Sequence, residues 1–172
     1  EHDIFAQSIL ISNDINLIKS VKLCLKSQLK DLSKKNIASR SIKNYGLAIY
    51  ANSTKKISEI VNLIAPEHLE ISFSKSKDLI KKIKNAGSIF IGKFSPEAMG
   101  DYIAGPNHVL PTSGSAKFSS GLSVNDFLKR HSLIKITKTG IERLGPSVIN
   151  LSQHENLEGH ARSVKIRLKK DL

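Results

Sequence analysis

The sequence has few of the features that several common classes of protein need. It contains a single cysteine, Cys24, so no disulfide can form within the chain. We therefore expect a reducing, cytoplasmic compartment, with Cys24 buried as a small apolar residue of a helix. No run approaches the roughly twenty apolar residues of a membrane helix, and no stretch resembles a signal peptide, so no membrane partner is expected.

Glycine-rich phosphate loops of the GxGxxG and GxxxxGKS kinds are also missing, as are serine and cysteine nucleophile motifs. If a nucleotide cofactor acts here, its usual signature lies elsewhere.

Acidic and aromatic residues are scarce. Lys and Arg number 27 against 15 Asp and Glu, a formal net charge of +12, and there are three Tyr, six Phe and no Trp. The basic excess is almost all lysine, spread along predicted helices, and few rings are available to stack on bases. We therefore expect a lysine-rich solvated surface and no nucleic-acid partner. A basic α/β module that binds nucleic acid is the alternative from a different class.

Short apolar runs alternate with amphipathic stretches in the first half of the chain. Strands are predicted at 8–12, 47–50, 69–73 and 88–91, and helices at 14–32, 33–44, 54–65 and 76–85. This alternation predicts βαβ units on a largely parallel sheet, where functional groups gather at the carboxyl ends of strands. From residue 122 the pattern changes to a strand at 133–136, a helix from 138 to about 144 and a last helix from about 153 to 168.

The most unusual stretch is Gly100–Gly114, GDYIAGPNHVLPTSG, with three glycines and two prolines. Proline restricts the backbone angles and glycine permits angles that other residues rarely adopt. We therefore expect these residues to hold Asp101 and His108 close together in a loop. The alternative is a long Gly/Pro loop with incidental polar groups.

Other titratable residues are candidates for chemistry. Glu67 and His68 directly follow Pro66, and an acid beside an imidazole suits proton transfer and water activation, although a solvated turn is the alternative. His2, Asp101 and His160 offer two imidazoles and a carboxylate, a set suited to zinc. They are far apart in the sequence, so their spacing does not show that they meet in the fold. His131 and His154 are expected at the surface.

Several segments together resemble the histidinol dehydrogenase family. They are EHDIFAQSIL (1–10), NLIAPEHLEI (62–71), the long block 85–130 and ENLEGHARSVKIRL (155–168). The resemblance spans nearly the whole chain in the family's order. It implies an NAD-dependent oxidation of L-histidinol to L-histidine through an aldehyde, the last steps of histidine biosynthesis, with one zinc ion in each site.

The resemblance also implies roles for single residues. Glu67 matches the acid that activates water and His68 the general base, while His108 has a supporting role. The implied zinc ligands are His2, Asp101 and His160, and the implied substrate-binding residues are His2, His68, Asp101, Glu155 and His160. The family is a homodimer whose tail crosses to the partner, so His160 and Glu155 would complete the other subunit's site. The NAD contacts are not assigned.

The chain also departs from the family's pattern. A Gln ligand two residues before the Glu-His pair would precede Glu1, and the amino-terminal half that binds most of the NAD is absent. We therefore expect a carboxyl-terminal portion, with a partial Rossmann-like domain over 1–121 and a small helical domain over 122–172. Alone, it should bind NAD poorly and have little activity. An inactive remnant that keeps the fold and the dimer contact is the alternative, and the retained set of site residues argues against it.

Overall fold

The computed structural model describes residues 1–72 and 76–169. It consists of two compact units, unit 1 (Glu1–Phe127) and unit 2 (Leu128–Leu172), and each is described by itself. The sequence-based boundary between residues 121 and 122 stays a prediction. No helix in the described part of the chain is both long enough and apolar enough to span a bilayer.

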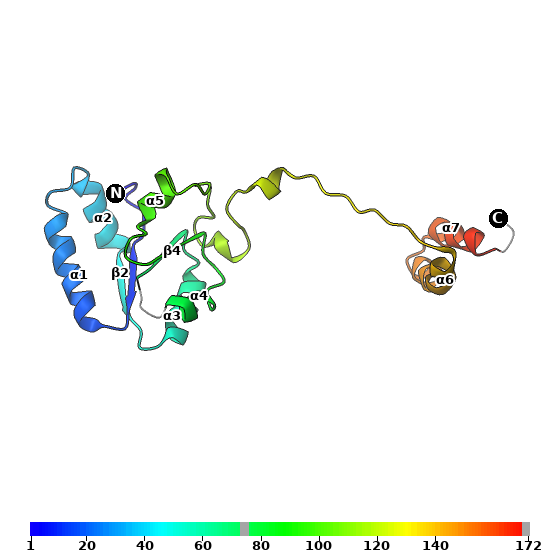
Figure 1. Ribbon diagram of the computed structural model, residues 1–172, viewed down its shortest axis with the longest axis horizontal. Coiled ribbons are helices and arrows are strands. Elements are labelled where there is room, and N and C mark those ends of the chain that lie inside the picture. Colours follow the sequence, from blue (N-terminus) through cyan, green and yellow to red (C-terminus); the bar gives the residue numbers. More distant parts are fainter. Residues whose placement is uncertain (73–75, 170–172) are drawn as a thin grey trace. The chain divides into compact units, whose positions relative to one another are not determined.

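The first half of unit 1 is a parallel strand pair with two helices between its strands. β1 (Ile9–Ser12) pairs with β2 (Leu47–Tyr50), and α1 (Ile15–Gln28) and α2 (Lys35–Tyr45) connect them (Figure 1). Asp14 caps α1, because its side chain accepts a 2.8 Å hydrogen bond from the backbone N–H of Asn16. The elements follow the predicted order, although α1 ends four residues earlier than predicted.

The expectation that Cys24 is buried is wrong. Cys24 is exposed, and α1 contains no buried residue. Its neighbour Leu23 is 70% exposed, so this side of the helix is uncovered within the described structure. The apolar pattern of α1 therefore indicated a helix correctly but not the depth of its burial.

The second half of unit 1 repeats the arrangement. α3 (Thr54–Ile64), β3 (His68–Ile71), α4 (Ser76–Ile80) and β4 (Ser88–Ile91) follow in order, and β3 pairs in parallel with β4. Part of the strand predicted at 69–73 lies outside the described residues. α4 is shorter than the predicted helix at 76–85, because Asn62 binds the next turn: its Oδ1 accepts from Lys84 N–H at 2.7 Å and its Nδ2 donates to Lys82 O at 2.8 Å.

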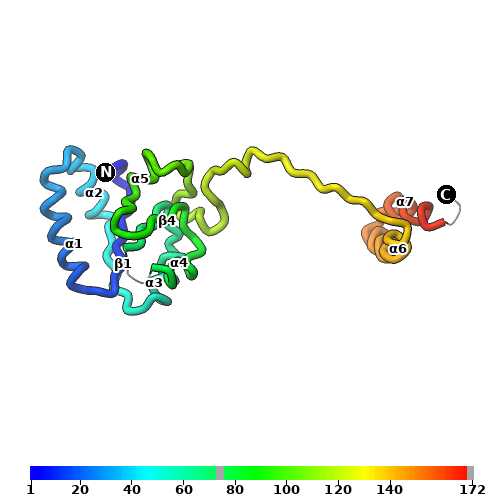
Figure 2. Tube along the Cα trace, in the orientation of Figure 1, coloured from blue at the N-terminus to red at the C-terminus, as the bar shows by residue number. Residues whose placement is uncertain are grey.

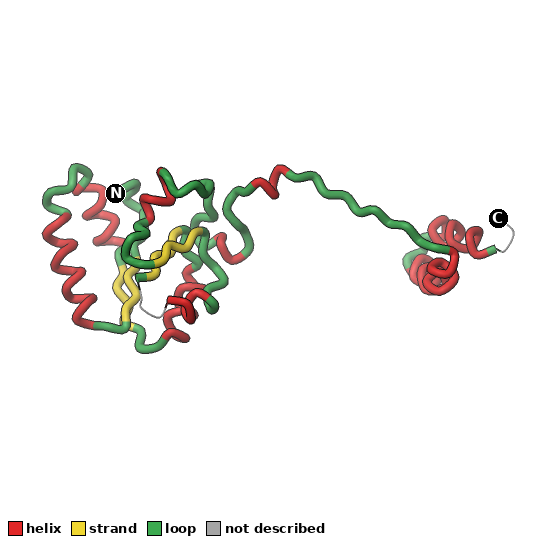
Figure 3. The backbone as a smooth tube through the Cα atoms, in the orientation of Figure 1, coloured by secondary structure: helices red, strands yellow, loops and turns green. Residues whose placement is uncertain are grey.

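The sheet differs from the single parallel sheet that the alternation predicted. Among the described residues the strands form two separate parallel pairs, β1–β2 and β3–β4, with helices around them (Figure 3). The α/β class is confirmed. The Rossmann-like arrangement stays a prediction.

The two faces of β3 have different surroundings. Because side chains alternate along a strand, Leu69 and Ile71 point to one side and His68 and Glu70 to the other. Ile71 belongs to the buried core with Ile57, Val61 and Leu79, and Leu69 packs against that core. His68 and Glu70 therefore occupy the opposite face, where α5 (Glu97–Tyr102) follows β4. Two short 3-10 turns, Ser115–Lys117 and Val124–Phe127, complete unit 1.

Unit 2 is a helical hairpin of α6 (Lys138–His154) and α7 (Glu158–Leu168), which pack side by side (Figure 2). α6 continues well past the predicted end near Leu144, and the last helix begins later than the predicted residue 153. α6 runs through Pro146, and the neighbouring Gly145 packs on α7, since a Cβ there would lie 3.0 Å from Leu168 Cδ1.

The strand predicted at 133–136 is wrong. These residues form no regular element, and Leu133 and Ile134 are 94% and 78% exposed. A strand needs a neighbour for its N–H and C=O groups, and the described part of unit 2 contains only helices besides this segment.

Candidate functional site

A tight backbone junction positions Glu67 and His68 at the start of β3. α3 ends at Ala65, which is fully buried in the left-handed conformation with φ 52°, and Pro66 then leads into the strand. The Glu67 carbonyl accepts from Ser88 N–H at 2.8 Å. Gly87 lies so close that a Cβ there would be 2.5 Å from the same oxygen. The pair thus lies at the amino end of β3, not at the carboxyl end where function was expected.

Asp101 lies in the last turn of α5, and not in a loop as the Gly/Pro pattern suggested. α5 rests closely on β4, because a Cβ at Gly100 would lie 2.6 Å from Cε1 of the Phe90 ring. The following loop then brings back His108, whose Nδ1 lies 3.0 Å from Asp101 Oδ1. The expected closeness of Asp101 and His108 is confirmed.

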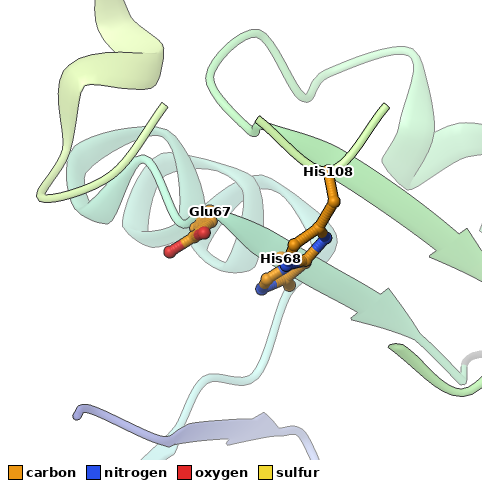
Figure 4. Close-up of side chains that lie close together, drawn as sticks. All are labelled: Glu67, His68 and His108. Carbon is orange, nitrogen blue, oxygen red and sulfur yellow. The ribbon is translucent and has the colours of Figure 1, made fainter. Parts of the chain in front are cut away.

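The rings of His68 and His108 stack on each other. Their centroids are 5.4 Å apart and their planes differ by 15°. Figure 4 shows the two rings together with Glu67. A ring nitrogen of each histidine and a carboxylate oxygen of Glu67 all lie within 4.8 Å of one another. Phe90 approaches the His68 ring at a centroid distance of 6.1 Å. These side chains come from two strands and a loop that are distant in sequence.

Two buried polar atoms in this cluster lack hydrogen-bond partners. Among the described residues, His68 Nε2 and Asp101 Oδ1 are both buried without one, and they lie 3.9 Å apart. Although His108 Nδ1 is at ion-pair distance from Asp101, its geometry is not that of a hydrogen bond. Buried polar atoms are normally paired, so two unpaired atoms facing each other fit a site that receives a cation or a substrate group.

Glu97 is a member of the cluster that sequence reasoning missed. Its Oε1 lies 3.7 Å from His68 Nε2, and one ligand atom from each of His68, Glu97 and Asp101 lies within 4.8 Å of the others. Burial, followed by the neighbouring Asp101 carboxyl, raises the pKa of Glu97 above 4.5, against the opposing charges of His68 and His2. The i,i+4 spacing of Glu97 and Asp101 in SPEAMGDY could have indicated this pair.

The other predicted site residues lie outside the two ligand groups. His2 is exposed, but it lies near enough to Glu97 to lower that pKa. Glu155 and His160 are both exposed in unit 2. They do not share one helix as predicted, because Glu155 caps the end of α6 and Asn156 turns the chain at φ 58°. His2 and His160 belong to neither ligand group found among the described residues. The expected exposure of His131 and His154 is confirmed.

Comparisons with known proteins agree with one another. The sequence profile of the family "Histidinol dehydrogenase" matches residues 1–168. The histidinol dehydrogenase of Pelagibacter ubique is 53% identical over 99% of this chain and 40% of its own length. That of Geobacter metallireducens is 47% identical over 98% of this chain and 39% of its own length.

A crystal structure of histidinol dehydrogenase from Elizabethkingia anophelis matches 97% of this chain and 38% of that one, with 37% identity and a TM-score of 0.89. The chain thus spans about 40% of the length of the relatives that it matches. From the profile match, the high identities and the shared fold, the chain belongs to the histidinol dehydrogenase family.

Proposed function

We propose that this chain supplies part of the active site of an NAD-dependent, zinc-containing dehydrogenase that oxidises L-histidinol to L-histidine through an aldehyde, in two steps. The observation that carries the proposal is that His68 Nε2 and Asp101 Oδ1 are both buried without a hydrogen-bond partner, with Glu67 and His108 beside them. Structural ion pairs are normally satisfied, whereas a site that awaits a ligand leaves such atoms open.

His68 is the proposed general base. Each oxidation releases a proton as well as a hydride, and an imidazole takes up protons near neutral pH. His68 Nε2 faces the carboxylates of Glu97 at 3.7 Å and Asp101 at 3.9 Å. Bound NAD⁺ would accept the hydride. Stacking on His108 and contact with Phe90 restrict the ring's orientation.

Glu67 is the proposed water-activating acid. An aldehyde must be hydrated before a second hydride can leave its carbon, so a base has to direct a water molecule at it. The Glu67 carboxylate lies within 4.8 Å of the ring nitrogens of His68 and His108, and its own backbone is held by β4. Two adjacent residues, Glu67 and His68, would therefore take up both protons that hydration and the second oxidation release.

Asp101, His2 and His160 are the proposed zinc ligands. Asp101 offers a buried, unpaired oxygen, and a mixed set of imidazoles and a carboxylate is the donor chemistry that zinc prefers. A bound zinc ion would hold and orient the imidazole and amine of the substrate. These ligands would thereby also be substrate-binding residues, together with His68 and the carboxylate of Glu155.

We further propose a cytoplasmic homodimer in which His160 and Glu155 of each copy complete the site of the other. Both side chains are exposed on a helical hairpin and so available to a second molecule. Because the chain spans about 40% of its relatives, we expect it to have little dehydrogenase activity by itself.

The test is a chimera in which residues 1–172 replace the matching segment of the Pelagibacter ubique enzyme, their relative at 53% identity. The chimera should reduce NAD⁺ when L-histidinol is added, and the isolated chain should not. A chimera that folds like its parent yet leaves histidinol unchanged would contradict the proposed function. Rapid NADH formation by the isolated chain would contradict its expected inactivity.

A further inference from the structure

Glu70 contacts the start of the helix that carries Glu97 and Asp101. Its Oε1 accepts a hydrogen bond of 2.7 Å from the backbone N–H of Glu97, the first residue of α5. Sequence reasoning gave Glu70 no role, and neither ligand group of the site includes it. A carboxylate that accepts from a first-turn N–H satisfies a donor without an intrahelical partner and complements the helix dipole.

The spacing of β3 matches the spacing of α5. His68 and Glu70 lie two residues apart on one face of the strand, a distance of about 6.6 Å. Glu97 and Asp101 lie four residues apart on the helix, about 6 Å along its axis. When Glu70 holds the Glu97 backbone, Asp101 therefore falls opposite His68, and the structure has their atoms 3.9 Å apart.

A second, apolar contact holds the same helix. Phe90 pairs with Glu70 in the β3–β4 register, and Gly100 of α5 lies directly against the Phe90 ring. This contact sets the distance of α5 from the strands but not its position along them, because a flat ring permits sliding. The directional hydrogen bond at Glu70 supplies the missing restraint.

We propose that Glu70 is a positioning residue of this site: by binding the Glu97 N–H, it fixes α5 so that Glu97 and Asp101 face His68. The inference rests on the proposed function for its use in catalysis, but the geometry that Glu70 imposes exists without substrate, cofactor or metal. Glu70 contacts none of the reacting groups and acts only through α5.

Three variants of the whole chain test this role. Glu70→Leu removes the acceptor, Glu70→Asp keeps the charge but shortens the reach, and Glu70→Gln keeps an oxygen at the same reach. Glu59→Leu is the matched control, because Glu59 is an exposed glutamate of α3 whose one ion pair within the described structure is with Lys56, at 3.7 Å. The probes are Zn²⁺ binding by calorimetry and, in metal-free protein, the imidazole NMR signals of His68 and His108.

Residues that orient ligands typically change metal affinity by about 10-fold or more. We expect Glu70→Leu and Glu70→Asp to weaken Zn²⁺ binding by about 10-fold, and Glu70→Gln by clearly less, with Glu59→Leu unchanged. The two histidine signals should shift in the Leu and Asp variants and return toward the parent's in the Gln variant. If Glu70→Leu fails to fold, the Asp and Gln variants decide.

Parent-like Zn²⁺ affinity and histidine signals in the Leu and Asp variants would overturn the proposal. So would equal losses in the Gln and Asp variants, since charge or general stability would then be responsible. If the isolated chain binds no Zn²⁺, the NMR signals of the metal-free protein decide the role of Glu70, and the zinc part of the proposed function is tested separately in the chimera.

Discussion

In unit 1, candidate residues from three separate segments lie in contact, whereas in unit 2 the two candidates stand exposed on a helical hairpin. His68 and Asp101 have side chains only 23% and 13% exposed, and each is oriented by neighbours on β4 or the following loop. Glu155 and His160 have open surroundings on α6 and α7. Burial restricts the first group to one geometry, and the second group keeps the rotamer freedom of surface side chains.

This contrast implies two kinds of contribution to a site. In unit 1 the packing of β3, β4 and α5 holds the polar groups together, so folding itself orders and desolvates these side chains. Unit 2 can order its residues only when something binds them.

His68 and His160 should both be essential in the chimera, but on different subunits. We expect His68→Ala and His160→Ala each to lower histidinol oxidation by about 100-fold or more, as loss of a general base or a metal ligand does. If each site takes His160 from the partner, mixing and refolding the two variants should restore activity, because a mixed dimer contains one intact site. Mixtures as inactive as the separate variants would show that both histidines serve the same subunit's site. His131→Ala, at an exposed histidine, is the control.

Replacing a closely packed glycine should cost more stability in unit 1 than in unit 2. Gly87→Ala places a methyl group 2.5 Å from the Glu67 backbone oxygen, which cannot move without displacing Glu67 and His68. We expect a loss of about 2 kcal/mol in unfolding free energy. Gly145→Ala meets only the ends of Leu168 and Val164 at 3.0 and 3.1 Å, and alanine favours the helix, so the change should lie within about 1 kcal/mol of zero.

Urea unfolding followed by circular dichroism measures both losses. Gly159→Ala, where nothing lies within 4 Å of the new methyl group, controls for the substitution itself. An equal loss for Gly87→Ala and Gly145→Ala would mean that the junction before β3 is no more rigid than the hairpin.

Glu97 should make the stability of the metal-free chain depend on pH. Because the pKa of Glu97 is raised above its ordinary value of 4.5, the folded state binds this proton more tightly than the unfolded state. Its contribution to stability is therefore fully present below pH 4.5 and is lost as the pH rises through the folded pKa. Glu97→Gln should then be more stable than the parent at pH 7, with a gain that shrinks toward pH 4.

Unfolding by urea in the presence of a chelator, repeated from pH 4 to pH 7, measures this dependence. Glu59→Gln, at an exposed glutamate, should show no such trend. A Glu97→Gln variant that is less stable than the parent at pH 7 would contradict the predicted sign.

Local signals explain why most elements could be predicted. Asp14 and Ser53 supply oxygens to first-turn N–H groups of α1 and α3, and these caps act within two or three residues of sequence. The failures arose from contacts between distant residues. Asn62 binds the turn that follows α4 from more than twenty residues away, and α6 packs on α7 beyond the proline at which a helix was expected to stop. The strand predicted at 133–136 failed for lack of a neighbouring strand.

Sequence alone was enough to predict the α/β class, the order of the elements up to β4 and the candidate site residues Glu67, His68, Asp101 and His108. Only the tertiary structure decided that Glu67 and His68 lie at the amino end of β3, that Glu97 joins them, and that Glu70 holds α5 over the strand face. The reason is physical: capping and periodicity act within a turn, whereas the cluster depends on a helix crossing two strands. No local pattern encodes that crossing.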